Sequence, residues 1–158
     1  MSSADLARPD AAASVPVLLV RAGACRCALP LRHVLETMRA LPVDVVAGAP
    51  AFLRGVAIVR GAPTPVVDLG ALVGQRAEVG RFVTISTGGA CVALAVEEVL
   101  GLTTWTRAEH AEAPPLLRDA VDHVLEAMTA LDEALVFVLS ACAIAERATA
   151  VVAASRAT

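Results

Sequence analysis

The chain contains no lysine, and aromatic side chains make up only 3% of its 158 residues. All thirteen basic residues are arginines, so the lysine of a phosphate-binding P-loop is missing, and neither G-x-x-x-x-G-K-[ST] nor G-x-G-x-x-G occurs. With a net charge of −3 at pH 7 and few rings on which bases could stack, the chain also lacks the basic, aromatic surface typical of nucleic-acid-binding proteins. These absences argue against P-loop phosphate chemistry and predict no nucleic-acid partner.

Long apolar runs are missing too, although hydrophobic residues make up 57% of the chain. The longest uncharged stretch, Phe82–Val96, is interrupted by threonine, serine and glycine and falls short of the ~20 apolar residues that a membrane-spanning helix needs. The first five residues, Met1–Asp5, have neither the basic start nor the apolar core of a secretory signal. We therefore expect a cytoplasmic protein without direct membrane insertion.

Short apolar runs separated by glycine and proline are present, and they are typical of an all-β domain of barrel type. Predicted strands cover residues 15–22, 25–31, 53–60, 64–69, 81–87, 90–96 and 135–140. Helical structure is predicted for a turn at 68–73 and for the alanine-rich segment 141–154, whereas 31–40 fits either a short helix or a strand. The hairpins 53–69 and 81–96 suggest two similar halves, and residues 1–13 are expected to be disordered.

The four cysteines lack the spacing of a metal or redox site. Cys25 and Cys27 form a single C-x-C pair on a predicted strand, and no second pair completes a zinc ligand set. We therefore expect all four thiols, including Cys91 and Cys142, to be small buried side chains, and we predict neither a metal nor a cofactor.

None of the three histidines, His33, His110 and His123, lies beside a recognisable nucleophile motif. The sequence therefore predicts no catalytic residue. A hydrolase or redox enzyme that uses a cysteine with His33 or His123 remains an alternative, because folding can bring together groups that are distant in sequence.

The segment Gly55–Leu69 consists of two apolar runs joined by a turn that carries one arginine, Arg60. The turn is predicted at Gly61–Pro63, since glycine and proline cannot continue a helix. A guanidinium at such a tip has five fixed donors, so it can either be solvated or hold a carboxylate in place.

This segment resembles the signature of the CheW-like domain family, G-x-x-N-x-R-G-x-x-x-P-x-x-D-L. Flanking segments resemble the same family in order and spacing, namely Cys27–Glu36, Val92–Gly101 and Leu131–Leu139. The positions that match the signature are Gly55, Arg60, Gly61, Pro65, Asp68 and Leu69.

The resemblance implies two small five-stranded SH3-like barrels packed together, with short helical segments and a C-terminal helix. It implies a CheW-like domain over residues 14–145, followed by a helical or frayed tail at 146–158. It further implies an adaptor that couples the cytoplasmic tip of a methyl-accepting chemotaxis protein to the regulatory domain of a CheA-type histidine kinase. Such an adaptor would be recruited to membrane-bound receptor arrays and would not be an enzyme.

By the same resemblance, the receptor-binding residues are Val34, Glu36, Gly55, Arg60 and Gly61. Val34 would supply apolar contact, Glu36 and Arg60 opposite charges, and the two glycines close backbone approach. The Glu36–Arg60 pair is also compatible with a plain intramolecular salt bridge, and both roles can hold together. Two further matching positions, Pro65 and Asp68, are expected to fix the turn after the second strand.

The chain departs from the family pattern at Ile58, where asparagine is usual, and at Glu97 and Ser140, where aspartate is usual. Ile58 removes a side chain that could hydrogen-bond to the turn backbone, and Pro63 is expected to add rigidity inside the turn. Our hypothesis is a groove tuned to a divergent receptor or to a non-chemotaxis pathway, such as surface motility or development. The other alternative is a protein that binds only the kinase regulatory domain.

Overall fold

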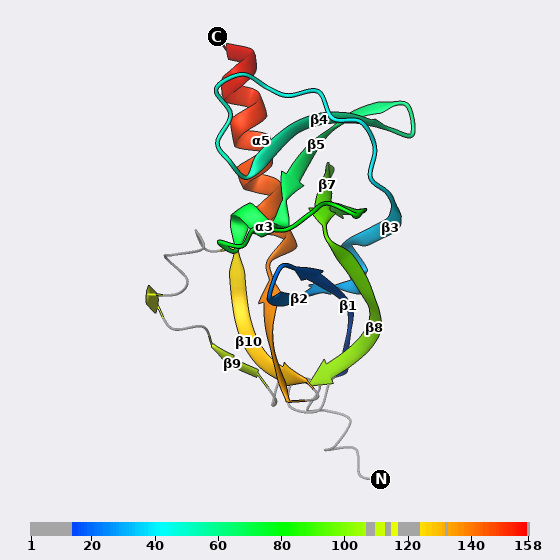
Figure 1. Ribbon diagram of the computed structural model, residues 1–158, viewed down its shortest axis with the longest axis vertical. Helices are drawn as coiled ribbons and strands as arrows, with labels where there is room; N and C mark the ends of the chain where they lie inside the picture. The colour runs from blue at the N-terminus through cyan, green and yellow to red at the C-terminus, as the bar shows by residue number, and fades with distance from the viewer. Residues whose placement is uncertain (1–13, 107–109, 113–114, 117–123, 132, 158) are drawn as a thin grey trace.

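Two small β-barrels and a C-terminal helix make up the computed structural model, which describes residues 14–106, 110–112, 115–116, 124–131 and 133–157 (Figure 1). The central barrel has the strand order β3-β6-β7-β5-β4, and the terminal barrel, built from both ends of the chain, has the order β8-β1-β2-β11-β10-β9. The strands are β1 (Ser14–Ala22), β2 (Cys25–Pro30), β3 (Val34–Arg39), β4 (Leu53–Val59), β5 (Ala62–Asp68), β6 (Arg81–Thr87), β7 (Ala90–Val96), β8 (Glu98–Thr106), β9 (His110–Glu112), β10 (Leu125–Leu131) and β11 (Ala134–Leu139). The helices are η1 (Leu31–His33), α3 (Leu69–Leu72) and α5 (Ala141–Ala157).

The two barrels repeat one strand arrangement. In the central barrel the antiparallel hairpins β4–β5 and β6–β7 are joined by a parallel pair, β5 with β7. In the terminal barrel the hairpins β10–β11 and β1–β2 are joined in the same way, β11 being parallel to β2. The expectation that the hairpins 53–69 and 81–96 belong to two similar halves is therefore wrong, because both lie in the central barrel.

Three apolar clusters account for the packing of the two barrels and α5. Phe82 and Ala93 fill the interior of the central barrel, and Val17 and Trp105 fill that of the terminal barrel. A larger shared core lies between the barrels and α5, and its members include Leu29, Ile85 and Ile144. Because successive side chains of a strand point to opposite faces, one sheet contributes side chains both to the interior of its own barrel and to this shared core.

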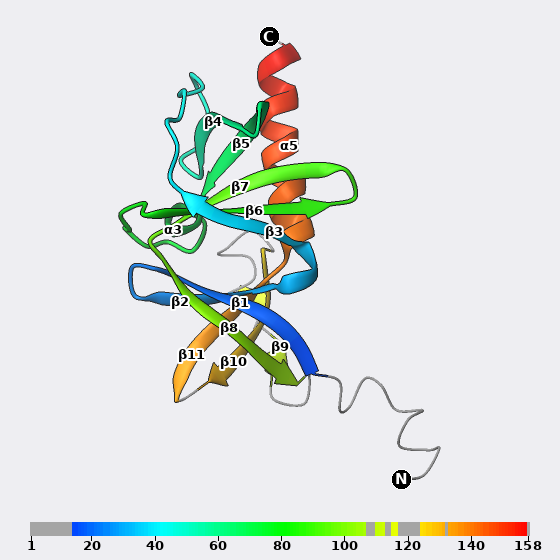
Figure 2. The same cartoon turned by 90° about the vertical axis from the view of Figure 1, so that its right-hand side faces the viewer.

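Helix α5 packs along the central barrel against β5, β6 and β7 (Figure 2). The hydroxyl of Ser140 accepts a hydrogen bond from the Ala143 amide at 3.2 Å, which is the contact of an N-cap. Farther along α5, the Arg147 guanidinium lies 4.7 Å from the centre of the Phe52 ring and ties the helix to the loop before β4. No helix among the described residues is long and apolar enough to span a membrane.

Most predicted strands agree with the structure, and those at 81–87 and 90–96 match its bounds. The ambiguous segment 31–40 forms the short helix η1 followed by β3, and the predicted helix at 141–154 extends to Ala157, so that residue 146 lies inside α5. Strands β8, β9 and β10 were not predicted, since Gly101 interrupts the first and Leu, Glu, Ala and Met in the last favour helix. Residues 1–13 lie outside the described residues.

Candidate functional site

The site begins at the turn between β4 and β5. Val59 pairs with Ala62, so the turn consists of Arg60 and Gly61, with φ of 50° and 81°. Two residues with positive φ give the backbone of a type I′ hairpin, whose twist matches that of the flanking strands. The predicted turn at Gly61–Pro63 is wrong by one to two residues.

Pro63 lies within β5, opposite Ile58, and not inside the turn. Two pairs farther from the turn, Pro65 lies opposite Val56, and the amide and carbonyl of Val56 hydrogen-bond to Asp44 on the other side of β4. Hydrogen-bonded and open pairs alternate along an antiparallel ladder, so both prolines occupy open pairs. Their missing amide protons therefore remove no hydrogen bond between β4 and β5.

A bidentate ion pair joins this turn to β3, at the opposite end of the strand order. Arg60 Nε donates to Glu36 Oε2 at 2.5 Å, and Nη2 donates to Oε1 at 2.8 Å. The Arg60 side chain is 76% exposed and that of Glu36 is 30% exposed. The hydrogen bonds from Arg60 lower the pKa of the Glu36 carboxyl, and the same contact raises the pKa of Arg60. The pair therefore stays ionised and holds a guanidinium at the surface in one orientation.

Gly55 lies away from this surface, buried in β4. Its φ is +143°, and a Cβ added there would lie 2.0 Å from the Asp44 carbonyl oxygen and 2.9 Å from the Val43 side chain. The close backbone approach expected at Gly55 is thus made within the chain, where Asp44 and Val56 exchange hydrogen bonds of 2.8 and 2.9 Å. This bridge closes the central barrel, since it joins the segment after β3 to the edge strand β4.

The other predicted contact residues lie near the ion pair. Val34 begins β3, two residues before Glu36, and packs half-buried against the shared core. Gly61 is exposed, and a Cβ added to it would meet nothing within 4 Å. The structure therefore brings together Glu36, Arg60 and Gly61, places Val34 on the adjoining part of β3, and leaves Gly55 inside the barrel wall.

Asp68 has a local structural role at the end of β5. Its Oδ1 accepts a hydrogen bond from the Ala71 amide at 3.2 Å and so caps α3, while Oδ2 lies 3.0 Å from Arg54 Nη1. Ser140 stands at the corresponding place after β11 and caps α5 in the same manner. Serine and aspartate are both strong N-caps, which explains why the departure at Ser140 is tolerated.

Ile58 projects from the outer surface of β4, and 59% of its surface is exposed. It lies two residues before the turn, so a partner that approaches Arg60 can also touch it. An exposed isoleucine replaces a hydrogen-bonding group with apolar surface, and water can be displaced from it on contact.

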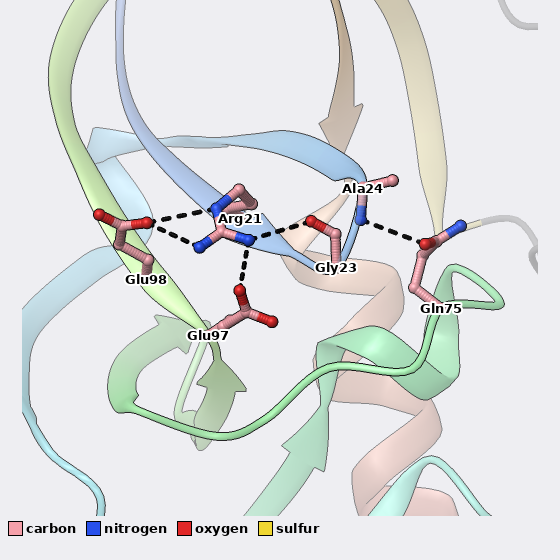
Figure 3. A network of polar contacts seen from close by, with 6 residues as sticks. All are labelled: Arg21, Gly23, Ala24, Gln75, Glu97 and Glu98. Carbon is pink, nitrogen blue, oxygen red and sulfur yellow. Dashed lines mark hydrogen bonds and ion pairs between the residues drawn. The ribbon is translucent and has the colours of Figure 1, made fainter.

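A second polar cluster, which the sequence did not reveal, lies where the two barrels join (Figure 3). Arg21 on β1 pairs with Glu97 and Glu98, and its Nη1 donates to the Gly23 carbonyl at 3.1 Å. Next to it, the Gln75 side chain accepts from the Ala24 amide at 3.2 Å. Glu97, the residue that replaces the usual aspartate, thus helps to hold the junction between β7 and β8. No local sequence signal could have paired Arg21 with residues so far along the chain.

Burial of the thiols is only partly as expected. Cys27 is buried and Cys25 is half-buried, but Cys91 and Cys142 are exposed, so the expectation is wrong for those two. Burial, with a smaller effect of Cys25, raises the pKa of Cys27 to about 12, and burial also raises the pKa of Cys25. The pKa of Cys91 is raised by burial and then by the nearby Glu36 carboxylate. These three thiols are therefore poor nucleophiles at neutral pH.

Cys142 and His33 line one cavity of about 590 Å³ between the β6–β7 turn and α5, together with Glu146. No hydrogen bond joins them among the described residues, and the described residues contain no group of three His, Cys, Asp or Glu side chains suited to a metal ion. Within the part of the chain that the structure describes, Cys142 and His33 are therefore not joined as nucleophile and base, and His123 lies outside that part.

Comparison with known proteins gives a family and a likeness to solved structures. The model of the CheW-like domain matches residues 16–149. The crystal structure of the scaffolding protein TtCheW from Thermoanaerobacter tengcongensis superposes with a TM-score of 0.70 at 18% identity, covering 80% of this chain and 88% of that one. This likeness shows that the two barrels are of the SH3-like kind found in that protein. No curated protein matches the sequence.

Proposed function

Because the chain belongs to the CheW-like domain family, we propose that it is a non-enzymatic adaptor that couples chemoreceptors to a CheA-type histidine kinase. The receptor partner is the cytoplasmic tip of a methyl-accepting chemotaxis protein, and the kinase partner is the regulatory domain. The protein then acts in the cytoplasm at membrane-bound receptor arrays.

The observation that carries this proposal is the exposed Arg60, held by Glu36 at the tip of the β4–β5 hairpin. Two of its nitrogens, Nε and Nη2, are used by the carboxylate, and within the described part of the chain Nη1 has no acceptor. A partner carbonyl or carboxylate oxygen can therefore accept a hydrogen bond from Nη1 of a guanidinium that is already oriented. Such preorganisation reduces the side-chain entropy that is lost on binding.

The neighbouring residues suit a partner that brings both apolar and polar groups. Gly61 leaves open space beside the guanidinium, so a partner backbone can come close there. Ile58 and the half-buried Val34 offer apolar surface on the two strands that Arg60 and Glu36 join. Receptor specificity would then depend on the apolar contact with Ile58 in place of a hydrogen bond.

The test is binding of the purified protein to two fragments from the same genome, a receptor cytoplasmic fragment and a kinase regulatory domain, measured by calorimetry. Arg60→Ala should weaken receptor binding at least about tenfold, because a charged hydrogen bond is worth about 1.5–3 kcal/mol. Arg60→Lys should weaken it nearly as much, since lysine keeps the charge but loses the planar fork. Arg54→Ala, which removes an exposed arginine also paired with a carboxylate, is the matched control and should leave affinity unchanged.

The remaining outcomes separate the alternatives. Binding to the kinase domain alone would favour a kinase-only protein, and binding to neither fragment would contradict the adaptor function. Ile58→Asn restores the residue usual in the family, and an altered receptor affinity would support tuning toward a divergent receptor. Unchanged affinity for every partner would remove the support for that tuning.

A further inference from the structure

Two arginines face each other on the outer surface of the central barrel. Arg39 at the end of β3 pairs directly with Arg81 at the start of β6, and both side chains are exposed. Directly opposite residues on antiparallel strands have Cβ atoms about 4.5–5.5 Å apart, where like charges repel. Within the described residues, no carboxylate forms an ion pair or hydrogen bond with either arginine.

The terminal barrel contains a matching pair in which the repulsion is compensated. Arg21 on β1 lies opposite Arg26 on β2, and Arg21 is neutralised by Glu97 and Glu98 (Figure 3). Glu97 and Glu98 also line a cavity of about 510 Å³ with Arg81, but their carboxylates are bound to Arg21. Among the described residues, carboxylates therefore bind an arginine of one pair and neither arginine of the other.

Apolar surface accompanies the uncompensated pair on the same face of β3. Burial alternates along the strand, and Leu35, Thr37 and Arg39 are its exposed residues. Leu35 is 61% exposed at a bulge in the pairing with β6. Arg39 lies four positions farther along the strand, which is about 13 Å at 3.3 Å per residue.

We propose that Arg39 and Arg81 form an anion-receiving contact for the carboxylates of a partner protein, with Leu35 as its apolar end. On a partner helix, the matching residues are an apolar side chain and an acidic one on the same face. They lie seven or eight positions apart, which is about 11–12 Å. Carboxylates placed between the two guanidiniums remove their repulsion, so binding a partner relieves a repulsion that is present in the free protein. This contact is separate from Arg60, and it rests on the proposed adaptor function only for the identity of the natural partner.

A protein carboxylate suits this surface better than the phosphates of a nucleic acid. Two arginines beside an exposed leucine do not make the extended basic track that nucleic-acid backbones require, and the whole chain carries a net charge of −3. The partner is therefore an acidic, partly apolar segment.

The test uses a fluorescein-labelled helical peptide that carries one leucine and two glutamates, at the seventh and eighth positions after it. A control peptide has the same composition with the glutamates on the opposite face. Anisotropy titration against the full chain should show binding of the first peptide, weakened by salt, and an affinity at least about tenfold lower for Arg39→Gln/Arg81→Gln. Arg26→Gln removes one positive charge from the compensated pair and should leave the affinity for the peptide unchanged.

Three results would overturn the proposal: no binding of the matched peptide to the wild type, equal affinity of the double variant, or equal loss in Arg26→Gln. Displacement of the peptide by inorganic phosphate would also contradict it, since that would indicate a phosphate site. Arg81→Gln should at the same time raise the melting temperature by removing repulsion, so lost binding cannot be attributed to unfolding.

The same variants separate this proposal from the adaptor function. If Arg60→Ala weakens binding to the receptor fragment but the double variant affects neither fragment, the adaptor function stands and the second contact to those partners fails. If neither fragment binds but the matched peptide does, the adaptor function fails and the anion-receiving contact stands.

Discussion

Replacing Gly55 with alanine should open the central barrel where its chain closes on itself. The new Cβ would lie 2.0 Å from the Asp44 carbonyl oxygen, and the backbone at φ +143° disfavours any L-residue. Relief of the clash requires Asp44 to move away from Val56, which breaks the two hydrogen bonds of 2.8 and 2.9 Å between them. No flexible side chain can absorb the clash, because the nearest atoms belong to the backbone.

The size of the effect follows from these parts. Backbone strain costs about 1–3 kcal/mol, overpacking about 1–3 kcal/mol, and each lost hydrogen bond about 1 kcal/mol. These losses overlap, so we expect the free energy of unfolding to fall by roughly 3–6 kcal/mol, out of the 5–15 kcal/mol that is typical of a domain. At about 2–4 °C per kcal/mol, the melting temperature should fall by roughly 6–24 °C.

Gly61→Ala is the matched control, since Gly61 also has positive φ but an added Cβ meets nothing within 4 Å. Its free energy of unfolding should fall only by the cost of backbone strain, about 1–2 kcal/mol. Urea unfolding of the wild type and both variants measures the difference, and hydrogen exchange at the Asp44 and Val56 amides reports the bridge itself. If Gly55→Ala loses no more stability than Gly61→Ala, or if both amides stay protected, the reasoning is refuted.

Three further predictions concern the ion pair, the helix cap and the thiols. Arg60 lowers the pKa of Glu36, so the stability from this pair is present above the ordinary glutamate pKa and is lost as pH falls through the lowered value. In Arg60→Ala, an NMR titration of the Glu36 carboxyl should therefore show a midpoint shifted upward. An unchanged midpoint would contradict the pairing. Ser140→Ala should cost about 1 kcal/mol in urea unfolding while Ser140→Asp costs almost nothing, and equal losses would argue against a capping role. An alkylating reagent should label Cys142 but leave Cys27 unmodified in the native protein, as mass spectrometry can show; labelling of Cys27 at the same rate would contradict its burial.

Local features of the chain were predictable where local chemistry decides the outcome. Gly88 and Gly89 specify a two-residue hairpin between Thr87 and Ala90, and β6 and β7 were therefore placed correctly. The helical turn predicted at 68–73 is present as α3, and Asp68 caps it; aspartate is a strong N-cap, so this feature is encoded locally. Strand β10 was missed because its leucine, glutamate, alanine and methionine favour helix, and only pairing with β11 and β9 makes it a strand.

The candidate site, too, has features that local sequence determines and features that only the tertiary structure determines. The sequence by itself determined the family pattern, the charged turn residue and its glycine neighbour, because a short motif carries its own residues and spacing. Only the tertiary structure decided that Arg60 meets Glu36, that Gly55 faces Asp44 inside the barrel wall, and that Arg39 lies opposite Arg81. Each of these contacts joins segments that barrel closure and strand register bring together, and no local preference of the chain encodes such long-range pairing.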